Sequence, residues 1–163
     1  VYTPLNNSEK YTLVLMGRAD FGLLGSYNKY KQTPFETFHV GGDGMTGSYT
    51  YATETIGLRG YDNGALTPYS DGRAYTRFSM ELHFPFLLQP SSTIYGLAFV
   101  EGGNAWTSLE NFNPFSLKRS AGVGVRIFLP MIGLMGIDWA YGFDKVQGEK
   151  GGGHFHFILG QEF

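Results

Sequence analysis

The sequence contains no cysteine, which excludes disulfide frameworks, catalytic thiols and thiolate metal sites. It also has no uninterrupted apolar stretch of the roughly 18 to 20 residues that a membrane-spanning helix requires, so a helical membrane protein is excluded. Charged residues make up 16% of the chain and the formal net charge is -2, so no large basic field is available to bind nucleic acid. Nucleic acid is therefore not an expected partner.

Aromatic residues and glycine, by contrast, are abundant. Aromatic side chains reach 17% of the chain, and 24 of the 163 residues are glycine. This pairing is typical of β-barrels, in which aromatic girdles mark the membrane interfaces and glycines form tight turns. The composition therefore favours an all-β fold.

Most of the chain alternates between apolar and small or polar residues with a period of two, as strands with two different faces do. In residues 135–143 all the large apolar side chains fall on one face: Met135, Ile137, Trp139, Tyr141 and Phe143. The alternation predicts about six strands, at residues 11–23, 74–84, 93–106, 121–129, 135–143 and 155–163. Turns are predicted at residues 85–92, 111–118, 130–131 and 147–153. Strands of about ten residues are long enough to cross a bilayer at a tilt.

The residue types on the second face distinguish a membrane barrel from a soluble one. In a small soluble, lipocalin-like barrel the non-apolar face is the outside and should carry many Lys and Glu residues. Here that face consists of Gly, Ser, Ala and isolated charges, which suits a crowded lumen. Leu97 and Phe99 share a face with Glu101, so we expect the inward side of that strand to contact packed protein. The pattern favours an antiparallel transmembrane β-barrel.

About fifty residues separate the first two predicted strands, far more than a hairpin connection needs. This predicted loop, residues 25–73, holds many glycines and the tract 57–64, which reads Gly-Leu-Arg-Gly-Tyr-Asp-Asn-Gly. Taken alone, an arginine between two glycines is most simply a solvated turn residue. A loop of this length nevertheless requires contacts that hold it in place.

Several motifs follow one another in one order along nearly the whole chain. Residues 35–42 read Phe-Glu-Thr-Phe-His-Val-Gly-Gly, residues 58–61 read Leu-Arg-Gly-Tyr, and downstream come the segments 79–82, 99–106 and 119–124 and an aromatic-ended last strand. Together they resemble the C-terminal part of the transmembrane barrel of BamA-type outer-membrane protein assembly factors, in the bacterial surface antigen superfamily. The first two motifs are similar to that family's sixth extracellular loop, and the downstream segments are similar to its final strands. The stretch between the Gly-Gly pair and residues 58–61 is longer than in the family's pattern.

The resemblance implies that a loop tip of four residues folds back into the lumen: Leu58, Arg59, Gly60 and Tyr61. It also implies that the tip arginine meets Glu81 and Glu101, and the alternation places both carboxylates on inward faces. A planar guanidinium can bind a carboxylate bidentately, which fixes its orientation. The glycine of the tip would allow the backbone to approach the barrel wall without a clashing Cβ.

The function implied by the resemblance involves no covalent chemistry. BamA-type proteins insert and fold other β-barrel proteins into the outer membrane through a lateral seam, where unpaired backbone groups can template an incoming strand. We therefore expect no enzymatic activity, catalytic residue, metal site or cofactor. The expected partners are nascent outer-membrane proteins, outer-membrane lipids and accessory assembly proteins. The expected seam residues lie in the last strand: Phe155, Phe157, Leu159, Gly160 and Phe163.

The chain would then form one C-terminal barrel portion over residues 1–163, without the upstream strands and periplasmic repeat domains of that family. The main alternative is a small complete outer-membrane barrel of eight strands with an adhesion, binding or structural role. Residues 1–10 and 35–51 would have to supply its two further strands, although neither alternates well.

Three other signals are weaker. His154 and His156 share a strand face and could hold a metal, but without an evident third ligand we interpret them as polar lining of the lumen. No motif around Ser120 supports the Ser-His-Asp triad of a hydrolase. Residues 42–47 match the letters of a dinucleotide fingerprint but lack the βαβ unit that it requires.

Overall fold

The computed structural model describes residues 2–4, 13–25, 36–44, 53–67, 72–89, 92–131, 133–146 and 152–160. Its main element is a sheet of seven strands. Their bounds are β1 Tyr2–Pro4, β2 Val14–Leu23, β5 Ala74–Gln89, β6 Ser92–Trp106, β7 Lys118–Leu129, β8 Gly133–Gly142 and β9 Gly153–Gly160. The prediction of an all-β fold with about six long strands is confirmed, and the three-residue β1 is the seventh strand.

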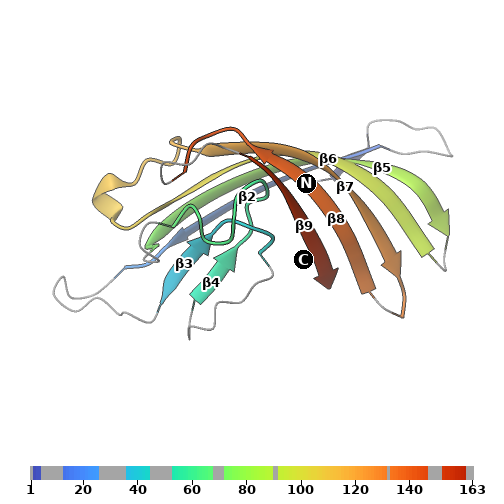
Figure 1. The fold of residues 1–163 in the computed structure, drawn as a ribbon, viewed down its shortest axis with the longest axis horizontal. Coiled ribbons are helices and arrows are strands. Elements are labelled where there is room, and N and C mark those ends of the chain that lie inside the picture. Colours follow the sequence, from blue (N-terminus) through green and yellow to red (C-terminus); the bar gives the residue numbers. More distant parts are fainter. Residues whose placement is uncertain are drawn as a thin grey trace.

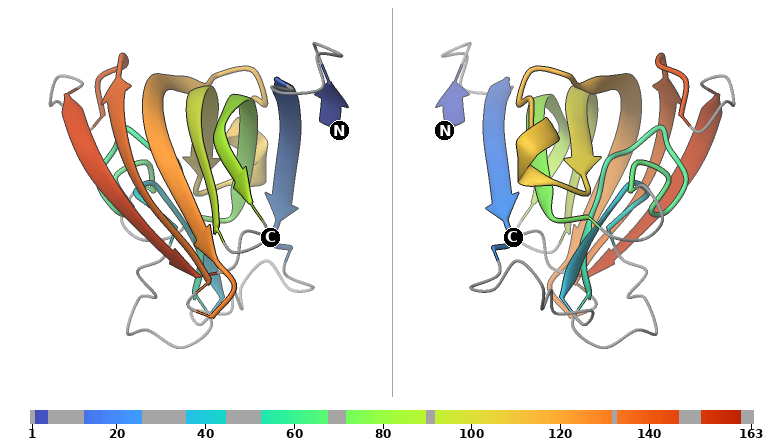
Figure 2. Two further views of the ribbon diagram at one scale, coloured as in Figure 1. Left: turned by 90° about the vertical axis from the view of Figure 1, so that its right-hand side faces the viewer. Right: turned by 90° about the vertical axis from the view of Figure 1, so that its left-hand side faces the viewer.

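The strands follow one another across the sheet in the order β1-β2-β5-β6-β7-β8-β9, each antiparallel to its neighbours. The long strands arch together in Figure 1, and Figure 2 shows an open curved wall with β1 at one margin and β9 at the other. Among the described residues, these two end strands do not pair with each other. The sheet, called the wall below, is therefore an open partial barrel.

Side-chain exposure alternates along the strands and separates two faces of the wall. In β9, Phe155, Phe157 and Leu159 are 69%, 62% and 63% exposed, whereas His156 between them is 6% exposed. Residues on neighbouring strands continue this apolar surface, since Trp139 pairs with Phe155 and Ile137 pairs with Phe157. The convex face is therefore apolar and open, as the alternation predicts for a surface in contact with lipid.

Two residues that the alternation of residues 74–84 places on the same face as Phe78 and Met80 are fully buried. Ala74 and Thr76 have the predicted parity in β5 but are 0% exposed. The register places Thr76 between Phe21 and Asn104, and Ala74 lies between similarly larger neighbours. Small side chains between large ones on a sheet are covered by them, so parity predicts the face but not the exposure.

The predicted turn at residues 85–92 is wrong over most of its length. The strand β5 continues to Gln89, and β6 already begins at Ser92. The register shifts between Pro85 and Leu87, so Phe86 forms a bulge. A bulge accommodates a proline, which has no N–H to donate, without ending the strand.

The other predicted turns lie largely where expected. Residues 107–117 connect β6 and β7 and include the single-turn 3₁₀ helix η2, Leu109–Asn111. Residues 130–131 form the predicted turn between β7 and β8, while most of the predicted turn at 147–153 lies outside the described residues. Within the described parts of the chain, no helix is long and apolar enough to cross a membrane.

The long segment between β2 and β5 forms a second, smaller sheet. Its strands β3, Thr37–Val40, and β4, Thr53–Ile56, pair in parallel with each other. Figure 1 shows this pair beneath the arch of the wall, on its concave side. Residues 35–51 therefore do not supply a further wall strand in the described part of the chain, as the eight-stranded alternative requires.

An apolar cluster fixes the segment to the wall. The buried side chains of the segment pack together with two side chains of the wall: Phe38, Val40, Ile56, Leu58, Tyr61 and Leu66 with Tyr75 and Ala105. The Val40 N–H donates to Thr67 Oγ1 at 2.8 Å, and Val40 O accepts from the Leu66 N–H at 3.1 Å. This core positions residues 58–61, called the loop tip below, against the concave face.

Candidate functional site

The loop tip begins one residue after β4, which ends at Ile56, and runs along the wall. Leu58 is fully buried and forms an isolated β-bridge with Gly42, so the Gly-Gly segment noted in the sequence holds the entry to the tip. The Gly42 N–H also donates to Tyr61 O at 3.1 Å. The tip is therefore fixed from the loop side as well as from the wall side.

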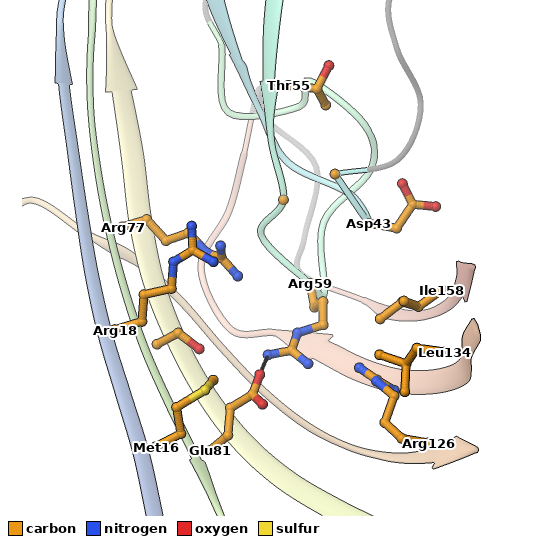
Figure 3. A pocket seen from close by; sticks show the side chains of 13 residues that line it. Met16, Arg18, Asp43, Thr55, Arg59, Arg77, Glu81, Arg126, Leu134 and Ile158 are labelled. Carbon is orange, nitrogen blue, oxygen red and sulfur yellow. Dashed lines mark hydrogen bonds and ion pairs between the residues drawn. The ribbon is translucent and has the colours of Figure 1, made fainter. Parts of the chain in front are cut away.

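The arginine of the tip reaches three carboxylates on three strands. Its Nη2 lies 2.7 Å from Glu101 Oε1 of β6, and its Nη1 lies 2.9 Å from Asp138 Oδ2 of β8. Arg59 Nη2 also pairs with Glu81 of β5, and the backbone N–H of Arg59 donates to Glu101 Oε2 at 2.9 Å. Figure 3 shows the Arg59 side chain pointing toward Glu81. The structure thus brings together the three residues that the resemblance associates, and adds Asp138.

Two further arginines of the wall complete the charge balance. Arg77 Nη2 lies 2.9 Å from Glu101 Oε1, and Arg126 Nη2 lies 2.7 Å from Asp138 Oδ2. Figure 3 shows these two side chains on opposite sides of the tip arginine. The arginine cluster is defined as three cations with three carboxylates: Arg59, Arg77 and Arg126 with Glu81, Glu101 and Asp138. Its formal charge is zero, which is the condition for burying so many ions.

The surroundings of Arg59 are desolvated. Burial alone would lower the pKa of Arg59, but Glu101, Glu81 and Asp138 outweigh it and raise that pKa further above its ordinary range. The guanidinium carbon also lies 3.6 Å from the centre of the Phe99 ring, a cation–π contact. Leu97, Phe99 and Ala140 form a small buried cluster beside it. The irregular inward face predicted for residues 93–106 is therefore the packed floor under the tip.

The backbone at Gly60 approaches the wall too closely for any other residue. It has a φ of 90°, and an added Cβ would lie 2.9 Å from Ser120 Cβ and 3.0 Å from Gly142 N. On the wall side, a Cβ at Gly142 would lie 2.4 Å from Gly60 O. Both glycines are needed for contact, since real Cβ atoms do not tolerate such distances.

Tyr61 anchors the other end of the tip at the start of β7. Its hydroxyl donates to Arg119 O at 2.6 Å and accepts from the Asp144 N–H at 3.4 Å. Burial raises the pKa of the Tyr61 hydroxyl, so it remains a neutral donor. Arg119 Nη2 pairs with Asp144 Oδ1 at 3.1 Å, which fixes the two backbone groups that hold the tyrosine.

The two histidines of β9 also contact the loop, which the sequence did not predict. The Gly60 N–H donates to His156 Nε2 at 2.9 Å, and His154 Nδ1 lies 3.2 Å from Asp62 Oδ1. The signal was present, because alternation places both rings on the inward face, where the loop packs. Within the described residues, no group of three His, Asp or Glu side chains is arranged to hold a metal.

The remaining predicted site residues lie in β9. Phe155, Phe157 and Leu159 are on the convex face, away from the tip. Gly160 ends the described strand with a φ of 133°, a conformation that favours glycine. Phe163 lies outside the described residues. The predicted site thus divides into a buried tip on the concave face and an apolar edge strand.

Beside the arginine cluster the concave face is hollowed. A cavity of about 410 Å³ lies between the loop and the wall and is lined mainly by polar side chains: Arg18, Asp43, Thr55, Arg59, Arg77, Ser79, Glu81 and Arg126, with Met16, Leu134 and Ile158. Figure 3 shows the residues that line it. The loop therefore fills only part of the concave face.

Comparison with known families adds one result. A sequence model described as the Omp85 superfamily domain matches residues 1–163. No curated protein matches the chain. The family match spans the wall, the loop tip and β9 together.

Proposed function

Because the chain belongs to the Omp85 superfamily, whose members are outer-membrane β-barrel proteins of protein biogenesis and transport, we propose that it inserts and folds β-barrel proteins into the outer membrane through a lateral seam at β9. In this proposal the convex face lies in lipid. The partners are nascent outer-membrane proteins, outer-membrane lipids and accessory assembly proteins. No bond is made or broken, so the reaction requires no catalytic residue.

The observation that carries the proposal is the position of β9. It is the end strand of the wall and has a neighbouring strand, β8, on one side only among the described residues. An end strand presents backbone N–H and C=O groups that an incoming strand can use, and antiparallel addition would extend the wall by one strand. The exposed apolar side chains of β9 would keep such a hybrid edge in lipid.

The docked loop supports the same function from the concave side. The loop tip binds β5, β6 and β8 through Arg59 and β7 through Tyr61. It therefore fixes the curvature of the wall next to the edge strand without occupying that edge. A seam can exchange partners only if the strands behind it hold their positions.

The test is site-specific crosslinking in lipid vesicles. Because the chain has no native cysteine, Phe157→Cys introduces a unique thiol in the edge strand. A β-barrel client carrying single cysteines along its terminal strand is added, and disulfide formation is followed together with client folding. We expect crosslinks at alternate client positions, as strand pairing dictates.

The matched control is Val123→Cys, which lies on the same face but in β7, inside the wall. It should not crosslink to the client. Client folding that proceeds without any β9 crosslink would refute the seam. Crosslinks to a cysteine in the concave cavity instead, for example Arg18→Cys, would indicate passage of a polypeptide through the lumen and a secretion function.

A further inference from the structure

Two contacts link the loop tip to the edge strand itself. The Gly60 N–H donates to the Nε2 atom of His156, a ring that is only 6% exposed. Two residues earlier in β9, His154 Nδ1 faces Asp62 Oδ1, and the two imidazoles stack with centroids 6.3 Å apart. The Gly60–His156 hydrogen bond is called the β9 latch below.

We propose that His156 is a positioning residue that ties the loop tip to β9, and that the tie exists only while its imidazole is neutral. The inference rests on the proposed function for its consequence, because it makes release of the edge strand sensitive to acid. The existence of the latch does not depend on the proposed function and can be tested separately.

The donor in the latch is a backbone N–H, and this determines which protonation state the His156 imidazole must have. A backbone N–H can only donate, so the ring nitrogen that faces it must carry a lone pair. A neutral imidazole supplies one acceptor nitrogen, whereas the imidazolium ion has N–H groups at both positions and cannot accept. Protonation of His156 would therefore place two donors against each other in a buried site.

The charges around the ring leave this requirement in place. The groups that face His156 are Asp43 and Arg59 of the loop, Asp138 of β8 and His154 of β9. Arg59 and Asp138 are bound to each other at 2.9 Å, so they act on the ring as a pair of opposite charges. Asp43 is the remaining carboxylate that acts on the ring.

The neighbouring histidine responds to acid in the opposite sense. Protonation of His154 would strengthen its attraction to Asp62, but the Asp62 side chain is 78% exposed, and exposed ion pairs contribute little. Loss of the buried latch should therefore outweigh the gain at the surface. As the pH falls and His156 becomes protonated, the tip should loosen from β9.

The location of the latch gives it a specific consequence. Among the contacts of the described loop tip, those of Arg59 and Tyr61 reach β5, β6, β7 and β8, whereas the latch reaches β9. Breaking the latch therefore removes the tip's hydrogen bond to the edge strand, which stays paired with β8, while the tip remains bound to the rest of the wall. Conversely, any outward movement of β9 must first break this hydrogen bond.

Amide hydrogen exchange of residues 58–61 in vesicles measures the latch directly. Exchange is recorded at pH 7.5 and 5.5 and divided by the intrinsic rate at each pH, for the wild type, His156→Gln and His156→Phe. The glutamine carbonyl can accept the same N–H but does not titrate, while phenylalanine fills the space without an acceptor. Asp62→Asn is the matched control, because it removes only the surface pair.

We expect the wild type to lose about tenfold in protection at pH 5.5, the size of one hydrogen bond. His156→Gln should keep high protection at both pH values, and His156→Phe should have low protection at both. Asp62→Asn should follow the wild type. The proposal would be overturned if His156→Phe were as well protected as the wild type, or if His156→Gln lost protection at pH 5.5 to the same extent as the wild type.

Client folding by the same vesicles separates this inference from the proposed function. If the exchange results are as expected and His156→Phe changes the folding rate while His156→Gln restores it, both stand. If exchange responds but no variant folds a client, the latch stands and the assembly function fails. If client folding is normal and identical in all variants despite a broken latch, the coupling to the seam is refuted.

Discussion

Substitution of Arg59 by alanine should release the loop tip while leaving the wall folded. In the wild type the cluster contains three cations and three carboxylates, and the side chains of Arg59, Glu81 and Glu101 are 7%, 7% and 0% exposed. Removing the arginine leaves one uncompensated negative charge where water has little access. The strand ladders do not include the loop tip, so they should persist.

The magnitude follows from the burial of the partners. Removing one member of a buried ion pair costs about 3 to 5 kcal/mol, chiefly because the other charge stays buried and unpaired. Each 1.4 kcal/mol is a factor of ten, so the ratio of docked to undocked loop should fall by at least about a hundredfold. The intact cluster need not add net stability, since the desolvation of its ions opposes their attraction.

Limited proteolysis of the loop measures docking, and heat-modifiable gel mobility in the same vesicles measures the wall. Arg59→Ala should be cleaved far faster than wild type at unchanged mobility, and Arg59→Lys should be intermediate, because one ammonium cannot reach three carboxylates in fixed directions. Arg59→Ala combined with Glu101→Gln should recover part of the loss by restoring charge balance. Arg18→Ala is the control, since its ion pair with Asp20 is half-exposed. Wild-type protease resistance of Arg59→Ala would refute the reasoning.

Three further changes test other parts of the site. Gly142→Ala places a methyl group against Gly60 O, so the loop should become protease-sensitive although no charge has changed. The hydrogen bond from Arg119 lowers the pKa of Asp144 below its ordinary 3.8, so its stabilisation is present above that pH and is lost as the pH falls through the lower value in the folded protein. Thermal unfolding of wild type and Asp144→Asn should therefore differ at pH 7 and converge as the pH falls through that lower value. Val123→Lys on the convex face should destabilise the protein in bilayers by about 2 to 4 kcal/mol in urea titrations if that face meets lipid, and by far less if it meets water.

The wall could be predicted from the sequence because alternation and face composition are local properties. The residue pattern of each strand alone shows which of its faces is apolar, as in residues 135–143. The extension of β5 past Pro85 could not be predicted in the same way, because a proline usually ends a strand and only the bulge at Phe86 allows it to continue. The parallel pairing of β3 with β4 depends on the tertiary packing of the loop and has no local signal in either strand.

Contacts in the site could be predicted where the sequence identified both partners, one by strand parity and the other by the resemblance. Parity placed Glu81 and Glu101 inward, and the resemblance indicated which loop residue faces them. Asp138 and His156 have the same parity but no motif, so nothing in the sequence selected them from the other inward polar residues. Their role depends on how deeply the tip reaches across the wall, which is set by the close approach of Gly60.

The loop tip uses a different kind of contact for each part of the wall, and this determines which part can be released. Arg59 binds β5, β6 and β8 through buried ion pairs, and the ordinary pKa values of Arg, Asp and Glu side chains lie outside the physiological pH range. Tyr61 binds a backbone carbonyl of β7 through a neutral hydroxyl. The contact with β9 depends on a histidine, the one side chain whose ordinary pKa lies within that range. A modest perturbation should therefore detach the tip from β9 before it detaches the tip from β5, β6, β7 and β8. This order is the one a seam at β9 requires, because the strands behind it must keep their positions.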